Sequence, residues 1–115
     1  MIVARHRERD LCFVEAYEAG VDVPLIRHPD GAWELDAVDP GELWDDYVDV
    51  EDPSERRDLI AEARRASRFF EVRLGDVGLD SLTVAEIREA LARSGGVVLE
   101  AAELGTRAAP VRAGP

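Results

Sequence analysis

The chain has 115 residues, enough for one domain but too few for two full hydrophobic cores. Apolar residues make up 46% of it, which predicts a packed core and excludes wholesale disorder. Acidic residues outnumber basic ones by 25 to 14, and the formal net charge of -11 argues against direct binding to nucleic acid.

Location and domain limits follow from the apolar pattern. No apolar run approaches the roughly 18 residues that span a bilayer, and residues 1–7 lack the apolar stretch of a secretory signal. We therefore expect a cytoplasmic protein without membrane contact. A single domain is expected over residues 1–104. Residues 105–115 are rich in Ala, Pro, Gly and Arg without periodicity, which predicts a mobile tail.

The first expected element is a helix over residues 11–19. Asp10 stands where a helix cap is favoured, and Gly20 stands where a helix commonly ends. The alternation of residue types between Leu11 and Tyr17 also allows a strand. We predict the helix.

A β-hairpin is predicted over residues 21–37. Residues 21–27 have an extended pattern, and residues 32–36 alternate apolar and polar side chains. Between them, the sequence His-Pro-Asp-Gly at 28–31 has the chemistry of a tight turn, because proline restricts one backbone angle and Asp-Gly accepts left-handed ones. We expect Trp33 on the inner face of this hairpin.

Three helices are expected after the hairpin. A short one runs from Asp39-Pro40 to residue 47, and a longer one covers residues 53–73 with apolar residues recurring on one face. Thr-Val-Ala-Glu at 83–86 is a capping-box pattern that opens a helix over residues 82–94. Residues 97–99 suggest a last strand. The predicted fold is α+β, a small antiparallel sheet built on the hairpin with two or three helices packed on one face.

Catalytic and metal-binding patterns were sought among the few residues that supply them. The only imidazoles are His6 and His28, each expected to be exposed and idle, and the single Cys12 is expected to be buried. No pair of residues has the spacing of a metal-ligand set, and the acidic stretch 45–52 lacks the central glycine and terminal glutamate of an EF-hand loop. We predict no enzyme activity, no cofactor and no metal.

The most distinctive feature is an acidic segment over residues 36–55, which carries nine carboxylates and no basic residue. One interpretation is a solvated surface that partly pairs with the arginines that follow it. The other is a protein-binding surface, because apolar and aromatic residues are interleaved with the acids and Trp44 is expected to be at least partly exposed. The predicted binding residues are Glu42, Trp44, Asp45, Asp46, Tyr47, Asp49 and Glu51.

From this segment we predict a non-enzymatic acidic protein-binding module that contacts a basic surface of another protein. An inhibitor, an assembly subunit and an accessory subunit all fit this description. An inhibitor that mimics the charge of nucleic acid, as some phage-encoded proteins do, would suit the charge balance.

An alternative function comes from residues 78–88, which read Gly-Leu-Asp-Ser-Leu-Thr-Val-Ala-Glu-Ile-Arg. These eleven of 115 residues resemble the modification site of acyl carrier proteins, where Asp-Ser-Leu opens a helix and the serine carries a phosphopantetheine arm. The resemblance implies that Ser81 is the attachment residue. The local alternative is that Asp80, Ser81 and Thr83 are capping residues at a helix start, which we predict for Ser81.

Overall fold

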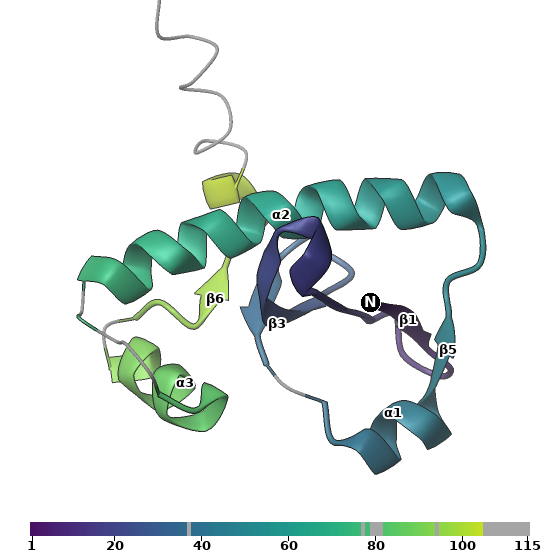
Figure 1. Cartoon of the computed structure of the whole chain (residues 1–115), viewed down its shortest axis with the longest axis horizontal. Helices are drawn as coiled ribbons and strands as arrows, with labels where there is room; N and C mark the ends of the chain where they lie inside the picture. Colours follow the sequence, from purple (N-terminus) through teal and green to yellow (C-terminus); the bar gives the residue numbers. More distant parts are fainter. Residues whose placement is uncertain (37, 77, 79–81, 94, 105–115) are drawn as a thin grey trace, which may run out of the picture.

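The computed structural model describes residues 1–36, 38–76, 78, 82–93 and 95–104, and the side chain of residue 76 is not described. Its centre is a six-stranded sheet with the strand order β5-β1-β2-β3-β4-β6, in which every pair of neighbours is antiparallel (Figure 1). The strands are β1 Ile2–His6, β2 Cys12–Ala16, β3 Val21–Arg27, β4 Trp33–Leu35, β5 Tyr47–Asp49 and β6 Val98–Leu99. The helices α1 Pro40–Asp46, α2 Pro53–Asp76 and α3 Val84–Arg93 complete an α+β fold, as predicted.

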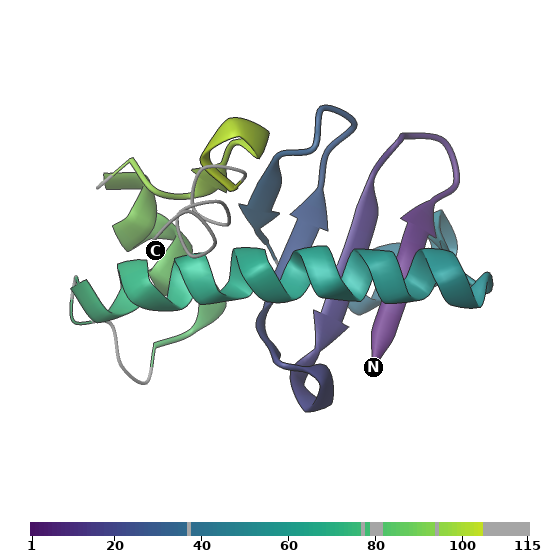
Figure 2. The ribbon, with the colours of Figure 1, turned by 90° about the horizontal axis from the view of Figure 1, so that it is seen from above.

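The long helix α2 lies across one face of the sheet (Figure 2). It begins where the Asp52 side chain accepts a hydrogen bond from the Glu55 backbone N–H at 2.9 Å. Its buried positions recur at helical spacing, at Leu59, Ala63, Ala66 and Phe70. The two alanines allow the helix backbone to approach the strands closely, and this packing forms the main core.

The sheet buries a second, smaller cluster on its opposite face. Side chains alternate between the faces along each strand, so Cys12 and Val14 point toward α2 whereas Phe13 points away from it. Phe13 packs there with Ala4 and Ile26, and with the half-buried Leu43 of α1. The helix α1 therefore covers a part of the face that α2 leaves open.

The helix predicted over residues 11–19 is wrong. This segment forms the strand β2 and then one turn of 3-10 helix at Tyr17–Ala19, which ends at Gly20 in the left-handed region at a φ of 85°. The strand pairs with β1 on one side and with β3 on the other. Because a central strand buries both faces, it carries an almost continuous apolar run rather than a clear alternation, and its pattern is easily confused with that of a helix.

The hairpin prediction is confirmed by the pairing of β3 with β4. The turn is closed by His28, whose N–H donates to the Ala32 carbonyl at 2.8 Å and whose carbonyl accepts from the Gly31 N–H at 2.9 Å. Gly31 has a φ of 90°, a conformation that glycine adopts without strain. Trp33 is fully buried on the α2 side of the hairpin, as expected.

The three predicted helices and the last strand are also present. At the start of α3, the Thr83 hydroxyl oxygen accepts from the Glu86 N–H, and the Glu86 carboxylate accepts from the Thr83 N–H, both at 3.2 Å. This reciprocal arrangement is the predicted capping box. Within the described residues, no helix is long and apolar enough to cross a membrane. The tail predicted over residues 105–115 lies outside the described residues.

A pH-dependent contact joins the C-terminal half of α2 to β3. Glu71 shares a hydrogen bond with the Asp22 carboxyl group, and this bond, together with burial and the charge of Asp22, raises the pKa of Glu71 to about 7. The ordinary value is 4.5. The folded protein therefore holds this proton over a pH range in which the unfolded chain releases it.

We expect the free energy of unfolding to fall as the pH rises from about 4.5 to about 7, because the unfolded chain releases the Glu71 proton in this window while the folded protein still holds it. The variant Glu71→Gln cannot ionise, so its stability should depend less on pH in this window and should exceed that of the wild type above it. Urea unfolding of both proteins between about pH 5 and pH 8 measures this effect. Glu89→Gln, on the exposed side of α3, is the control, and an equal pH dependence in all three proteins contradicts the prediction.

Candidate functional site

The acidic segment folds into α1, β5 and the link to α2. The Asp39 side chain caps α1 by accepting from the Gly41 N–H at 2.9 Å, and Pro40 occupies the first turn. The helix ends because Tyr47 adopts extended angles, with a φ of -120° and a ψ of 153°, and continues into β5. We name the six exposed residues of the predicted binding set the acidic edge: Glu42, Trp44, Asp45, Asp46, Asp49 and Glu51.

Trp44 is the most exposed large apolar side chain in the described part of the chain, with 85% of its surface accessible. Its neighbour Leu43 turns inward and packs on the second cluster, so α1 presents one side to the sheet and the other to solvent. The expectation that Trp44 is exposed is thus confirmed. Full exposure of an indole is costly in water, because its large apolar surface stays hydrated.

Tyr47 does not belong to the exposed surface, which corrects the predicted binding set. Its side chain is only 5% exposed, and its ring meets those of His6 and Phe13 edge-on, with centroid distances of 5.0 Å and 6.4 Å. Burial raises the pKa of its hydroxyl. The ring turns inward because α1 ends before Tyr47, and from there the side chains alternate between the two faces of the sheet. The helical pattern of residues 40–46 does not predict this change of direction.

The carboxylates of the acidic edge stand apart from the ion pairs of the described residues. Among the described residues, none of the ion pairs includes Glu42, Asp45, Asp46, Asp49 or Glu51. The arginines close to this region have other partners, since Arg5 pairs with Glu55 and Arg56 donates to the Val50 carbonyl at 2.9 Å. None of the described ion pairs joins the acidic edge to the arginines of α2, whereas two other acids of the segment do pair with arginines, Asp36 with Arg88 and Glu55 with Arg5. The interpretation as a solvated, partly paired surface therefore stands beside the interpretation as a protein-binding surface.

A polar cavity of about 350 Å³ lies between the first half of α2 and the sheet, close to the acidic edge. Two arginines line it, but Arg5 is paired with Glu55, and the Arg27 Nε lies 2.6 Å from the Glu62 carboxylate. Cys12 also lines this cavity, and burial raises the pKa of its thiol. A protonated thiol is a poor nucleophile, and the two ion pairs join α2 to the sheet across this cavity.

Both histidines have structural partners and are less exposed than expected, whereas the expectation that neither has a catalytic role stays a prediction. The His6 Nδ1 accepts from the backbone N–H groups of Glu8 and Arg9 at 3.1 Å and 3.0 Å, which shapes the turn between β1 and β2. The His28 Nε2 lies 2.9 Å from a carboxylate oxygen of Glu34. Each side chain is half-buried. The spacing of residues in the sequence does not predict the contact between His28 and Glu34, because it depends on the register in which β3 pairs with β4.

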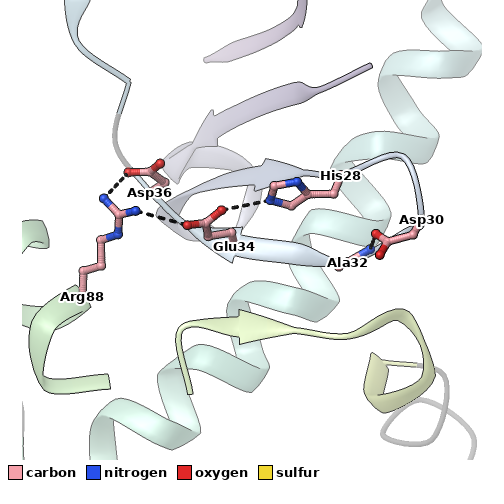
Figure 3. Close-up of polar contacts among 6 residues, drawn as sticks. All are labelled: His28, Asp30, Ala32, Glu34, Asp36 and Arg88. Atoms are coloured by element: carbon pink, nitrogen blue, oxygen red, sulfur yellow. Dashed lines mark hydrogen bonds and ion pairs between the residues drawn. The ribbon is translucent and has the colours of Figure 1, made fainter. Parts of the chain in front are cut away.

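Glu34 belongs to a chain of charged groups that joins α3 to the hairpin (Figure 3). Arg88 of α3 reaches the Glu34 carboxylate at 3.2 Å and the Asp36 carboxylate at 3.1 Å. His28 approaches Glu34 from the other side, as the dashed lines in Figure 3 show. No serine or cysteine takes part in these contacts, so the cluster has the composition of a structural latch rather than of a nucleophilic site.

Other ligand sites were sought in the part of the chain that the structure describes. It contains no group of three His, Cys, Asp or Glu side chains that could hold a metal ion. Ser81, the residue singled out by the carrier-protein resemblance, lies outside the described residues, so its role as a cap or as an attachment residue stays a prediction. Thr83 provides the side-chain cap seen at the start of α3.

Comparisons of this chain with protein-family models, with curated proteins and with solved structures found no match. The class of protein and its function are therefore argued from the residues and contacts described above.

Trp44 is exposed and Tyr47 is buried, which predicts a small effect of truncation on stability for the first and a large one for the second. Trp44→Ala should change the free energy of unfolding by less than about 0.5 kcal/mol, because the indole is exposed. Tyr47→Ala should cost about 3 kcal/mol, because it empties part of the second cluster. Urea unfolding of both variants measures the difference. A large loss of stability in Trp44→Ala would place the indole in the core.

The latch predicts a local effect of Arg88. Arg88→Ala removes two partly exposed ion pairs, so it should lower the free energy of unfolding by about 1 kcal/mol or less. Hydrogen exchange should nevertheless become faster in α3, because this helix loses its contact with β4. Arg93→Ala is the matched control, since Arg93 pairs only with Glu89 of the same helix among the described ion pairs. Equal exchange rates in the two variants would show that Arg88 does not fasten α3.

Proposed function

We propose that this chain is a non-enzymatic acidic protein-binding module that contacts a basic surface of a partner protein through the acidic edge. The observation that carries the proposal is Trp44, which is 85% exposed on α1 among carboxylates that take part in no ion pair within the part of the chain that the structure describes. An aromatic anchor surrounded by charged residues has the composition of a protein interface.

The two kinds of residue have separate roles in this proposal. The indole of Trp44 supplies binding energy, because burial against a partner removes its apolar surface from water. The carboxylates supply selectivity and speed, because they attract a basic surface over a distance of about one Debye length, roughly 8 Å at physiological salt. The net charge of -11 strengthens this attraction and disfavours direct contact with nucleic acid.

Inhibition, assembly and accessory roles all require such an interface, and each remains compatible with it. A cytoplasmic location is part of the proposal. It is supported by Cys12, which is a free buried thiol of the kind that persists in reducing compartments.

A matched pair of charge reversals tests the proposal against proteins captured from a bacterial lysate. In the first variant, Asp45 and Asp46 of the acidic edge are changed to arginine. In the control, Glu89 and Glu100 are changed to arginine, which alters the net charge equally at exposed positions away from the edge.

We expect the first variant to bind a captured partner at least about tenfold more weakly, and the control to bind almost as the wild type does. Trp44→Ala should also weaken binding, and affinity should fall as salt is added. Calorimetry with the purified partner gives the dissociation constants. Equal losses in the two charge variants, or binding that ignores salt and Trp44, would contradict the proposal.

A further inference from the structure

Part of the acidic edge lies on β5, which is the terminal strand of the sheet. In the strand order, β5 stands at one end and pairs only with β1 among the described strands. In Figure 1 the chain runs from α1 through β5 to α2 along this side of the molecule. The end strand of a sheet presents backbone N–H and C=O groups that can pair with another chain.

The register of β5 shows which of its backbone groups point outward. Hydrogen bonds to β1 bracket the strand, because the Arg7 N–H donates to the Asp46 carbonyl at 2.7 Å and the Val50 N–H donates to the Val3 carbonyl at 2.9 Å. In an antiparallel pair, bonded positions alternate with positions that face away. Residues 46, 48 and 50 therefore face β1. The carbonyl of Tyr47 and both backbone groups of Asp49 face the outer edge.

The side chains of β5 alternate in the same way. Val48 stands opposite Arg5, whose side chain pairs with Glu55 of α2, so Val48 lies on the α2 face. Asp49 stands opposite Ala4, which belongs to the second cluster, so Asp49 lies on the other face. Val48 is 41% exposed, and Asp49 is exposed. An added strand would therefore meet an apolar side chain on one face and a carboxylate on the other.

We infer that a basic segment of the partner binds as an additional antiparallel strand on the outer edge of β5. This inference rests on the proposed function, since it specifies how the acidic edge holds its partner. Antiparallel pairing is the arrangement of every described strand pair in this sheet. A segment that alternates basic and small apolar residues fits, with its basic side chains beside Asp49 and its apolar side chains beside Val48.

The charge of the edge disfavours a second copy of the chain as the occupant. Antiparallel pairing of two β5 strands would bring acids of one copy, such as Asp46, Asp49 and Glu51, close to acids of the other copy. Like charges on paired strands repel each other, and the acidic segment contains no arginine that could offset this repulsion. A basic segment brings the opposite charge to the same positions.

The register makes a specific demand on the added strand. A residue directly opposite Asp49 exchanges both backbone hydrogen bonds with it, and its side chain lies on the same face. If that residue is basic, the N–H groups of the basic residues point toward β5, and those of the apolar residues point to solvent. A methyl group on the backbone nitrogens of the basic residues therefore blocks pairing with β5, whereas a methyl group on the backbone nitrogens of the apolar residues does not.

Three synthetic seven-residue peptides of alternating arginine and valine test this demand. The first peptide is unmethylated. The second is methylated on the backbone nitrogens of its arginine residues, and the third on the backbone nitrogens of its valine residues. We expect the second peptide to bind the whole chain at least about tenfold more weakly than the first, through loss of the backbone hydrogen bonds. The third should stay within about threefold of the first. Fluorescence of Trp44 or calorimetry gives the affinities.

Two variants of the protein test the same contact from the other side. Asp49→Ala and Asp49→Pro remove the same carboxylate, but only the proline removes the outward N–H. The pairing of β5 with β1 uses neither backbone group of Asp49, so an edge proline is tolerated there. We expect Asp49→Pro to bind the unmethylated peptide at least about fivefold more weakly than Asp49→Ala.

The outcomes separate this inference from the proposed function. Equal affinities for the two methylated peptides, or a stronger loss from methylated valine, would overturn the antiparallel strand while the salt dependence and the Trp44 contribution still supported the acidic edge. Failure of the unmethylated peptide to bind would also overturn the added strand, whereas the proposed function would fail only if binding of a captured partner ignored the charge variants, salt and Trp44. If Asp49→Pro does not fold, the peptide series alone decides, because it uses the unchanged protein.

Discussion

The structure depends on the packing of α2 across one face of the sheet. With a rise of about 1.5 Å per residue, a helix of 24 residues is about 36 Å long, enough to cross all the strands that it contacts. It contacts β1, β2, β3 and β4, which all precede it within residues 2–35 of the chain. Alanine at positions 63 and 66 and serine at position 67 keep the contact close. The Ser67 hydroxyl oxygen also accepts from the Asp22 N–H at 2.9 Å, so no polar cost remains from its burial.

This packing also decides where the charges go. The helix brings Glu55 and Glu62 over the arginines of β1 and β3, and Glu62 additionally accepts from the Trp33 indole N–H at 2.8 Å. These acids neutralise the charges that lie between helix and sheet. The carboxylates of the acidic edge have no such partners among the described ion pairs, because α1 and β5 lie at the edge and on the other side of the sheet. The arginines between α2 and the sheet are thus paired with acids of α2, whereas the exposed carboxylates of the acidic edge keep their negative charge at the surface.

The same edge has two physical consequences. An exposed strand at the end of a sheet invites pairing between copies of a protein, and like charges on that strand oppose such pairing. The carboxylates beside β5 therefore disfavour self-association, whatever partner the protein binds. They favour a basic chain for the same electrostatic reason, and Trp44 adjoins them as an apolar surface that a partner can cover.

The sequence by itself determined the elements whose signals are local. Turn chemistry at residues 28–31, the capping box at 83–86 and the apolar spacing along 53–73 predicted the hairpin and the helices α2 and α3, because each pattern acts over one or two turns of chain. The tertiary structure alone decided the rest. The strand β2 became recognisable only through its pairing on both sides, and the burial of Tyr47 followed from the place where β5 joins β1. The contact between His28, Glu34 and Arg88 likewise needed α3 to reach the hairpin. Pairing and burial of this kind join residues far apart in the chain, so no local pattern records them.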